Sequence, residues 1–344
     1  MPSDDGNSTS ITIKDVAKAA GVSHATVSRV INNNDRVAAD KRQRVLDAMS
    51  SLGYVPNMQA RSLAGGRSKV IGLLVPDIGN GYTGTIFEGI DAEMSAHQYE
   101  MMLYTTHSRK ANEPIYVQSL TQGMAEGLLL LVPVDPSAYL KELRKNNFPY
   151  VVIDHQGFDT FSPTVVATNR QGAYDGTAYL ISLGHRRIGF VTGWHNTSSS
   201  TERLAGYTDA LNDHPIPYDD SLVVPGDFTH SGGYKAGVQL LELADPPTAI
   251  FAANDVSAFG VIDAVRERGL HIPNNISIMG FDDIPQAQWM NPALTTVRQP
   301  LFEMGRAAMK MLLEYIENPR APTQRLQLST ELVIRETCAR CKNI

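Results

Sequence analysis

The sequence predicts a two-part α/β protein in which a small helical module precedes a larger body built on parallel β-sheets. Three observations support this class. Short amphipathic helices are indicated between residues 11 and 52, apolar strands alternate with helical stretches from residue 70 onward, and basic charge is concentrated at the start of the chain. With 344 residues, 42% of them hydrophobic, the chain can form two or three domains with sizeable cores.

The first two helices are predicted from the stretch "TIKDVAKAAGVSHATVSRVIN", in which a glycine separates two short periodic segments. Thr12 and Asp15 have the spacing of a capping box, and Ser23 can cap the second helix. Apolar residues at three- and four-residue intervals give each helix one buried stripe. These stripes are expected to consist of Val16, Ala17 and Ala20, and of Val27, Val30 and Ile31.

A third helix is expected from about Asp40 to Leu52, with Gly53 ending it. Its buried stripe is predicted to consist of Val45, Leu46, Met49 and Leu52. Three helices with complementary stripes can enclose a small core.

The second helix has a polar face, formed by His24, Ala25, Ser28, Arg29 and Asn32. In a helix-turn-helix unit such a face lies in the DNA major groove, with residues near the helix N-terminus reaching base edges. Residues 11–69 hold ten Lys or Arg against four Asp, whereas the whole chain has a net charge of −6. Local basic charge fits a polyanionic partner such as double-stranded DNA. The alternative is a generic three-helix cap with a solvated polar face.

The body is predicted to contain two parallel sheets in succession, each covered by helices on both faces. The expected strands are the segments VIGLLV, YEMMLYT, GLLLLV, YVVID, RIGFVT, TAIFAA and ISIMGF. Polar residues follow several of these strands, namely Asp77, Asp154, Asn254, Asp255, Asp282 and Asp283. Ligands of open α/β sheets bind beyond the carboxyl ends of the strands. Structural roles as loop or helix caps are favoured for Asp255 and Asp283.

Several motifs closely resemble the lactose-repressor and galactose-repressor (LacI/GalR) family of bacterial transcription regulators. They are "ITIKDVAKAAGVSHATVSRVIN", "LGYVPNMQARSLAGGRSKVIGLLVPD", "YLISLGHRRIGFVTG", "RLAGY", "AIFAANDVSAFG", "ISIMGFDD" and "PALTTVRQP", and the resemblance runs from Ile11 to about Arg335. It implies a helix-turn-helix headpiece and a hinge, followed by a periplasmic-binding-protein-like core of two subdomains joined by three crossovers.

The implied domain boundaries place a disordered N-terminus at 1–10, the headpiece at 11–56 and the hinge at 57–69. The N-subdomain of the core is expected at 70–168 and 299–327, and the C-subdomain at 169–298 and 328–344.

The resemblance also implies how the headpiece reads a palindromic operator as a homodimer. Base contacts are expected from His24, Ala25 and Arg29, and backbone contacts from Thr12, Ser23, Thr26, Ser28 and Asn32. Hinge contacts in the minor groove are expected from Asn57, Ala60 and Leu63, with Leu63 as the apolar wedge. Members commonly begin the third helix with a capping Ser, whereas this chain has Ala38.

An effector is expected in the cleft between the subdomains. The resemblance assigns ligand roles to Asp154, Arg203 and Asp282, and Phe228 and Tyr82 can supply flat walls for a sugar ring or a base. Asp77, Ser199 and Asn254 complete the predicted site, while Trp194 and Trp289 are assigned to the core or rim. Acceptor carboxylates, one Arg and aromatic walls favour a neutral sugar. A purine, a phosphorylated sugar or a partner protein are the alternatives. Thr197 stands where the purine-responsive member has an Arg, and "NGYTG" at residues 80–84 departs from the common Asn-Pro-Phe-Phe.

Other function classes receive little support from the sequence. We find no nucleophile elbow, phosphate-binding loop, dinucleotide fingerprint or zinc-protease motif, so we expect no enzyme, cofactor or metal. A secreted sugar-binding transport protein would need a signal peptide, and no long apolar run predicts a membrane span. Cys338 and Cys341 are interpreted as part of an exposed tail. The sequence therefore predicts a cytoplasmic, sugar-responsive repressor that forms a dimer.

Overall fold

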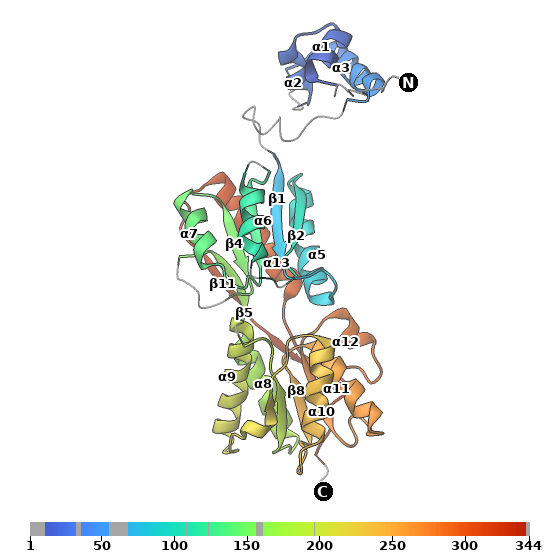
Figure 1. Cartoon of the computed structure of the whole chain (residues 1–344), viewed down its shortest axis with the longest axis vertical. Helices are drawn as coiled ribbons and strands as arrows, with labels where there is room; N and C mark the ends of the chain where they lie inside the picture. Colours follow the sequence, from blue (N-terminus) through green and yellow to red (C-terminus); the bar gives the residue numbers. More distant parts are fainter. Residues whose placement is uncertain are drawn as a thin grey trace, which may run out of the picture. The chain divides into compact units, whose positions relative to one another are not determined.

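The computed structural model describes residues 11–31, 36–54, 68–107, 109, 111–122, 124–155, 161–195 and 197–341. The chain divides into two compact units at residue 68, and each is described by itself (Figure 1). None of the described helices is both long and apolar enough to cross a membrane.

The first unit is a bundle of the helices α1 (Ile13–Ala20), α2 (His24–Ile31) and α3 (Ala39–Leu52). Its core is formed by Val16, Ala17, Ala20, Val27, Val30, Val45 and Ala48. The buried stripes predicted for the first two helices are therefore confirmed, with Ile31 packing at the edge of the core. The prediction for Leu46 is wrong, because its side chain is 45% exposed. Ala48, three residues after Val45, occupies the buried face of α3 instead.

The ends of these helices follow the predicted capping chemistry. Asp15 accepts hydrogen bonds from the Thr12 backbone N–H (2.8 Å) and hydroxyl (2.7 Å), and Ser23 Oγ accepts from the Thr26 N–H (3.2 Å). Gly53 ends α3 in the left-handed conformation, with φ of 61°, as Gly often does at this position. Ala38 precedes α3 with extended backbone and no side-chain cap, so the first turn of α3 lacks the hydrogen bond that a Ser would make.

The first sheet of the second unit is parallel throughout, in the order β11-β5-β4-β3-β1-β2. Its strands are β1 (Val70–Val75), β2 (Glu100–Thr105), β3 (Gly127–Leu131), β4 (Tyr150–Ile153), β5 (Thr164–Ala167) and β11 (Arg325–Leu328). Its helices are α5 (Gly81–Ala96), α6 (Asn112–Thr121), α7 (Ser137–Lys145) and α13 (Leu301–Glu317).

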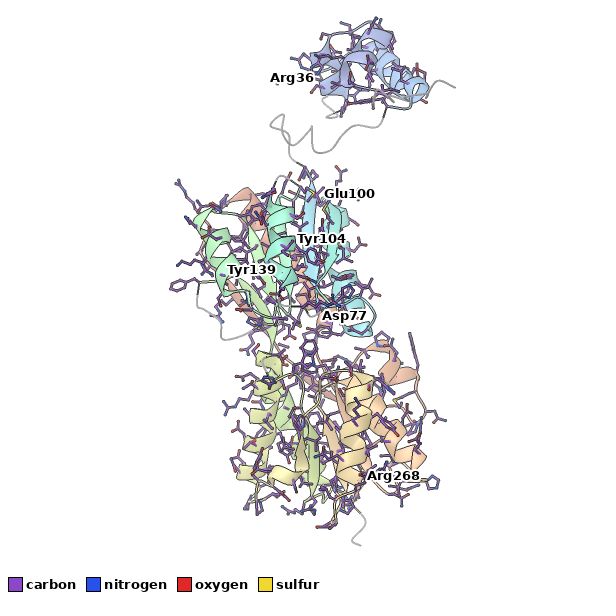
Figure 2. The ribbon with its side chains drawn as sticks, viewed as in Figure 1. Arg36, Asp77, Glu100, Tyr104, Tyr139 and Arg268 are labelled. Atoms are coloured by element: carbon purple, nitrogen blue, oxygen red, sulfur yellow. The ribbon has the colours of Figure 1, made fainter. Side chains whose placement is uncertain are left out.

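Two apolar clusters cover the faces of this sheet. Leu129 and Leu131 of β3 pack with α5 and α13, whereas Leu128 and Leu130 pack with α6 and α7, as the two-residue period of a strand requires. Tyr139 of α7 and Tyr104 of β2, both labelled in Figure 2, belong to the second cluster. Because both faces are covered, the central strands β1, β3 and β4 are apolar along nearly their whole length.

The second sheet has the order β12-β10-β9-β8-β6-β7. Its strands are β6 (Ile188–Val191), β7 (Val223–Val224), β8 (Ala249–Ala252), β9 (Ser277–Asp282), β10 (Thr295–Arg298) and β12 (Glu331–Val333). Helices α8 (Asn169–Ser182) and α9 (Ser198–Asp213) cover one face, and α10 (His230–Leu241) and α11 (Asp255–Glu267) cover the other. A short helix, α12 (Pro285–Trp289), follows β9. The edge strand β12 is antiparallel to β10, which the sequence patterns do not predict.

The chain passes from one sheet to the other three times, between β5 and α8, between β10 and α13, and between β11 and β12. Two of these crossovers are joined by hydrogen bonds. The Thr330 N–H donates to Thr168 Oγ1 (2.9 Å), and the two hydroxyl oxygens are 2.9 Å apart. The third crossover follows Arg298, and there the Gln299 N–H donates to the carbonyl of Asp282 (3.1 Å).

Candidate functional site

The exposed face of α2 carries the residues predicted to read DNA bases. His24, Ala25 and Arg29 are exposed, while Val27 and Val30 on the opposite side are buried. Of the predicted phosphate contacts, Thr12 and Ser23 are exposed and Thr26 and Ser28 are half-buried. Ser23 and Thr26 share a hydrogen bond between their hydroxyls (2.9 Å), so the start of α2 presents a fixed pair of oxygen atoms. Asn32, Asn57, Ala60 and Leu63 lie outside the described residues.

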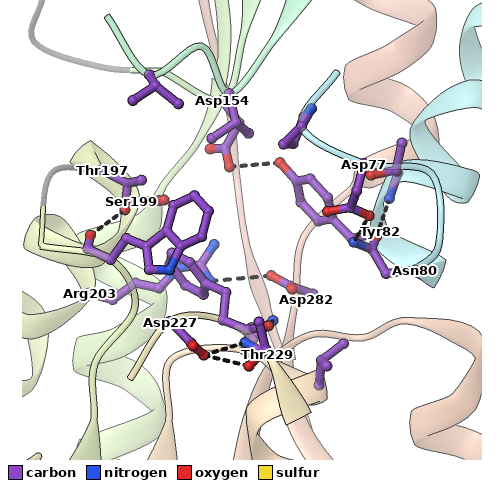
Figure 3. A pocket seen from close by; sticks show the side chains of 18 residues that line it. Asp77, Asn80, Tyr82, Asp154, Thr197, Ser199, Arg203, Asp227, Thr229 and Asp282 are labelled. Carbon is purple, nitrogen blue, oxygen red and sulfur yellow. Dashed lines mark hydrogen bonds and ion pairs between the residues drawn. The ribbon is translucent and has the colours of Figure 1, made fainter. Parts of the chain in front are cut away.

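A pocket of about 200 Å³ is lined by residues that follow strands of both sheets of the second unit (Figure 3). The structure brings all eight predicted effector residues to this pocket: Asp77, Tyr82, Asp154, Ser199, Arg203, Phe228, Asn254 and Asp282. Because the strands are parallel, their carboxyl ends meet at the same edge of each sheet.

Arg203 is the central cation of the pocket and is only 2% exposed. Its Nε donates to Asn169 Oδ1 (2.8 Å), and its Nη1 donates to the carbonyl of Ala253 and lies 3.3 Å from Asp282 Oδ1. Its guanidinium carbon is 3.8 Å from the centre of the Phe281 ring and 5.9 Å from that of Phe228, within the range of cation–π attraction. The arginine is therefore held in one orientation before any ligand binds.

Asp282 ends β9 and is buried beside Arg203. Burial raises the pKa of Asp282 to about 7 and exceeds the opposing effect of Arg203, while the charge of Asp154 raises it further. Gln299, in the third crossover, donates through Nε2 to Asp282 Oδ1 (2.7 Å). The carboxyl group thus joins the pocket to a crossover between the sheets.

A second pair of residues lies on the α5 side of the pocket. The Tyr82 hydroxyl donates to Asp154 Oδ2 (2.7 Å), and Figure 3 shows these two side chains pointing toward each other. Burial, followed by the negative charge of Asp154, raises the pKa of Tyr82 well above its ordinary value, so the hydroxyl keeps its proton. Asp77 Oδ1 accepts from Asn80 Nδ2 (2.8 Å), and Asn80 Oδ1 in turn caps α5.

Four lining residues have left-handed backbone, which is unusual for residues other than glycine. They are Val132 (φ 43°), Asp154 (φ 53°), Phe228 (φ 61°) and Asp282 (φ 114°). Asn254 holds one of them, because its Nδ2 donates to the Phe228 carbonyl (3.1 Å) while its Oδ1 caps α11. Gly193 lies under the Phe228 ring, where a Cβ would come within 1.9 Å of the ring. Strained backbone of this kind gathers at binding sites.

The pocket also contains residues that the sequence patterns do not predict there, and Trp194, which the sequence places at the core or rim, lines it as well. Trp194, Thr197, Asp227 and Thr229 line it, and Asn169 and Gln299 orient its charged groups. Trp289, by contrast, is 75% exposed and does not line the pocket. Asp227 and Thr229 follow β7, which is too short to show a period, whereas Trp194 and Thr197 follow the predicted strand β6 but lie three and six residues beyond its end. Their polar and aromatic character in "GWHNTSS" and "GDFTH" was the only available signal.

Asp255 and Asp283 have structural partners, as expected, although neither caps a loop or helix. Asp255 is fully buried and accepts from the Ile284 N–H (2.9 Å) and the Thr296 hydroxyl (2.5 Å). Asp283 forms ion pairs with Arg298 (2.7 Å) and Arg335 (2.6 Å). Asp255 thereby ties α11 to the chain after β9 and to β10, whereas Asp283 ties the end of β9 to β10 and to the chain beyond β12.

Comparison with known proteins agrees with both units. The family model "Bacterial regulatory proteins, lacI family" matches residues 12–57, and the model "Periplasmic binding protein-like domain" matches residues 177–338. The HTH-type transcriptional repressor PurR of Proteus mirabilis is 37% identical over 330 residues, which cover 95% of this chain and 97% of that repressor.

Solved structures give the same result. The Lac repressor dimer bound to operator and an anti-inducer has a TM-score of 0.84 and 28% identity, covering 96% of this chain and 99% of the repressor chain. The complex of the transcriptional regulator CelR with cellobiose has a TM-score of 0.74 and 31% identity, covering 95% and 99%. On the evidence of its helix-turn-helix unit, its two-sheet core and these relatives of nearly equal length, the chain belongs to the LacI family of bacterial regulatory proteins.

Proposed function

We propose that this protein is a transcriptional repressor that binds a palindromic operator as a homodimer and is controlled by a neutral sugar in the pocket. The observation that carries the sugar assignment is the convergence of acceptor carboxylates, one oriented arginine and aromatic side chains at the carboxyl ends of two parallel sheets. Because the relatives are named as repressors and regulators, we infer a sensor rather than an enzyme. Such a regulator acts at the chromosome, so a cytoplasmic location belongs to the same proposal.

The DNA-reading role rests on the exposed face of α2. Arg29 can make a bidentate hydrogen bond to guanine, a contact that contributes about 1–3 kcal/mol of discrimination between bases. His24 and Ala25 lie near the N-terminus of the same helix, where base edges are reached in this motif. The Lac repressor structure with operator supports the assignment by likeness.

The charge of the pocket favours an uncharged ligand. Among the described residues that line the pocket, there are four carboxylates and one guanidinium. The carboxylates are those of Asp77, Asp154, Asp227 and Asp282, and the guanidinium is that of Arg203. This guanidinium already forms an ion pair with Asp282 and a hydrogen bond with Asn169. Little positive charge is therefore left for a phosphate or carboxylate group of a ligand. Ligand hydroxyls, which both donate and accept, fit such a site. The relative with bound cellobiose supports the same class.

The size of the pocket agrees with a small ligand. Its volume of about 200 Å³ lies below the roughly 300–1,000 Å³ of sites for drug-sized molecules. Phe228 and Trp194 line the pocket on the side of the second sheet and can stack on the apolar face of a sugar ring.

Control of DNA binding follows from linkage between the two sites. The pocket takes residues from both sheets, and three crossovers join the sheets. A ligand that binds one arrangement of the two subdomains more tightly shifts the protein toward that arrangement. We infer that this shift changes operator affinity, by the 5- to 150-fold that is typical of allosteric coupling.

The test begins with a palindromic site selected from random double-stranded DNA by the protein itself, at fixed salt because phosphate contacts depend on salt. Operator affinity is then titrated against D-glucose, D-ribose and cellobiose, with a purine base and a sugar phosphate as further arms. We expect one sugar to shift the affinity, and the direction of the shift separates an inducer from a corepressor. A shift with the purine or the sugar phosphate alone would overturn the sugar assignment.

Two variants separate the two sites. R29A should lose specific operator binding and keep sugar binding, whereas D154N should keep operator binding and lose the sugar response. D154N preserves the shape of the side chain and its ability to accept from Tyr82. If R29A abolishes sugar binding, or D154N abolishes operator binding, the assignment of separate sites is wrong.

A further inference from the structure

The hydroxyl of Thr83 is buried and has no hydrogen-bond partner among the described residues. The residue lies in the first turn of α5, lines the pocket and is only 1% exposed. Its Oγ1 is buried and has no hydrogen-bond partner within the described chain. Its backbone N–H donates to Asn80 Oδ1 (2.9 Å), so the helix cap holds the residue in place. Thr83 is thus held at the wall of the pocket, and its hydroxyl has no hydrogen-bond partner in the part of the chain that the structure describes.

Three other hydroxyls at the pocket are already engaged. Tyr82 donates to Asp154 (2.7 Å), Thr197 to the Trp194 carbonyl (2.8 Å) and Thr229 to Asp227 (2.6 Å). These bonds brace the pocket wall. Thr83 differs from these three residues because its hydroxyl makes no hydrogen bond within the described chain.

A neighbour on the same helix shows the ordinary behaviour of a helical threonine. Thr85 is two residues further along α5, and its hydroxyl donates to the Gly81 carbonyl four residues back (2.9 Å). A buried hydroxyl without a partner is costly, and native proteins keep few such groups. Thr83 lies in the first turn of α5, where the residue four positions back, Gly79, precedes the helix, so the helix does not supply its hydroxyl with the partner that Thr85 has.

We propose that Thr83 is a specificity-determining residue whose hydroxyl hydrogen-bonds a hydroxyl group of the effector on the α5 side of the pocket. This rests on the proposed function, in which the pocket binds a neutral sugar. A threonine hydroxyl both donates and accepts, so it complements another hydroxyl better than a methylene or a carboxylate does. The N-terminal end of α5, a helix of 16 residues, also favours an electron-rich oxygen at this position. A site built in this way rejects a deoxy analogue, because that analogue leaves the buried hydroxyl unpaired.

The test compares T83V, which removes the hydroxyl at nearly constant shape, with T83S, which retains it. T85V is the matched control, since it deletes a hydroxyl that has a partner and does not line the pocket. Binding of D-glucose, D-ribose and cellobiose to the full-length protein is measured by calorimetry. For the sugar that binds, we expect T83V to lose at least about tenfold in affinity, as a lost hydrogen bond to a buried group implies, and T83S and T85V to stay near wild type. Equal affinity of T83V and wild type would overturn the proposal.

Thermal unfolding without sugar provides a second readout that does not depend on the ligand. T83V should melt at or above the temperature of wild type, because it removes an unpaired buried hydroxyl, whereas T85V should melt lower. If T83V is destabilised as much as T85V, the hydroxyl has a structural partner and the proposal is wrong. If wild type binds none of the three sugars, the proposed effector class fails, and the melting comparison still decides the role of Thr83.

Discussion

At the scale of single residues, the buried carboxyl group of Asp282 carries a pH dependence that can be measured. Its folded pKa of about 7 lies above the ordinary 3.8, because burial disfavours the charged form. A raised carboxyl pKa means that the folded state is favoured when the group is protonated. This contribution to stability is complete below about pH 4 and is lost as the pH rises through 7.

We therefore expect D282N to flatten part of the pH profile of stability. The difference in unfolding free energy between wild type and D282N should fall by roughly 2–3 kcal/mol between pH 5 and pH 8, because about two of the three pKa units of the shift lie above pH 5. Urea unfolding at several pH values measures it. Parallel profiles for the two proteins would show that Asp282 is ionised over the whole range. Arg203, Asp154 and Asp255 remain in the variant. Because the charge of Asp282 raises the pKa of Asp255, the difference reports Asp282 together with its effect on Asp255.

At the same scale, the sequence could indicate the pocket residues that follow apolar strands. Asp77, Asp154, Asn254 and Asp282 were found in this way, because strand ends are marked by the apolar runs before them. Their roles in ligand binding stay predictions. Asn169 and Gln299 were missed because they lie at the start of α8 and in a crossover, and their partners Arg203 and Asp282 belong to other elements. Such contacts are created only by the tertiary fold.

At the scale of elements, all seven strands expected from apolar runs are present, whereas short strands escaped the sequence analysis. β7 has two residues and β12 three, too few to show a period. In α3, the choice between Leu46 and Ala48 as a buried residue was decided by packing rather than by hydrophobicity. Ala48 belongs to the core that α1, α2 and α3 share, and the larger Leu46 is exposed.

The missing cap of α3 leads to a prediction for the same element. A38S should place a hydroxyl at a position whose extended backbone already suits a cap, with φ of −56° and ψ of 141°. We expect it to stabilise the first turn of α3 by about 0.5–2 kcal/mol. Hydrogen exchange of the amides in that turn measures the gain, and A39S is the matched control because Ala39 is already inside the helix. Equal protection in A38S and A39S would count against the cap.

At the scale of the whole molecule, linkage between DNA and effector must act in both directions. If a sugar changes operator affinity by some factor, the operator must change sugar affinity by the same factor. We expect calorimetric titrations of the sugar, with and without operator, to reproduce the factor obtained from DNA binding. If the two factors differ by more than experimental error, the sugar and the operator do not act on the same two conformations of the protein.

The tight contact between α5 and α13 gives the pocket a mechanical connection. A Cβ at Gly89 would come within 1.9 Å of the Phe302 carbonyl oxygen, and a Cβ at Gly305 within 2.1 Å of the Ile86 carbonyl oxygen. The two backbones therefore touch directly, without flexible side chains between them to absorb a displacement. α5 begins at the pocket wall, and α13 begins just after the crossover that follows β10. If a bound ligand displaces the first turn of α5, we therefore expect α13 and the crossover before it to move with α5.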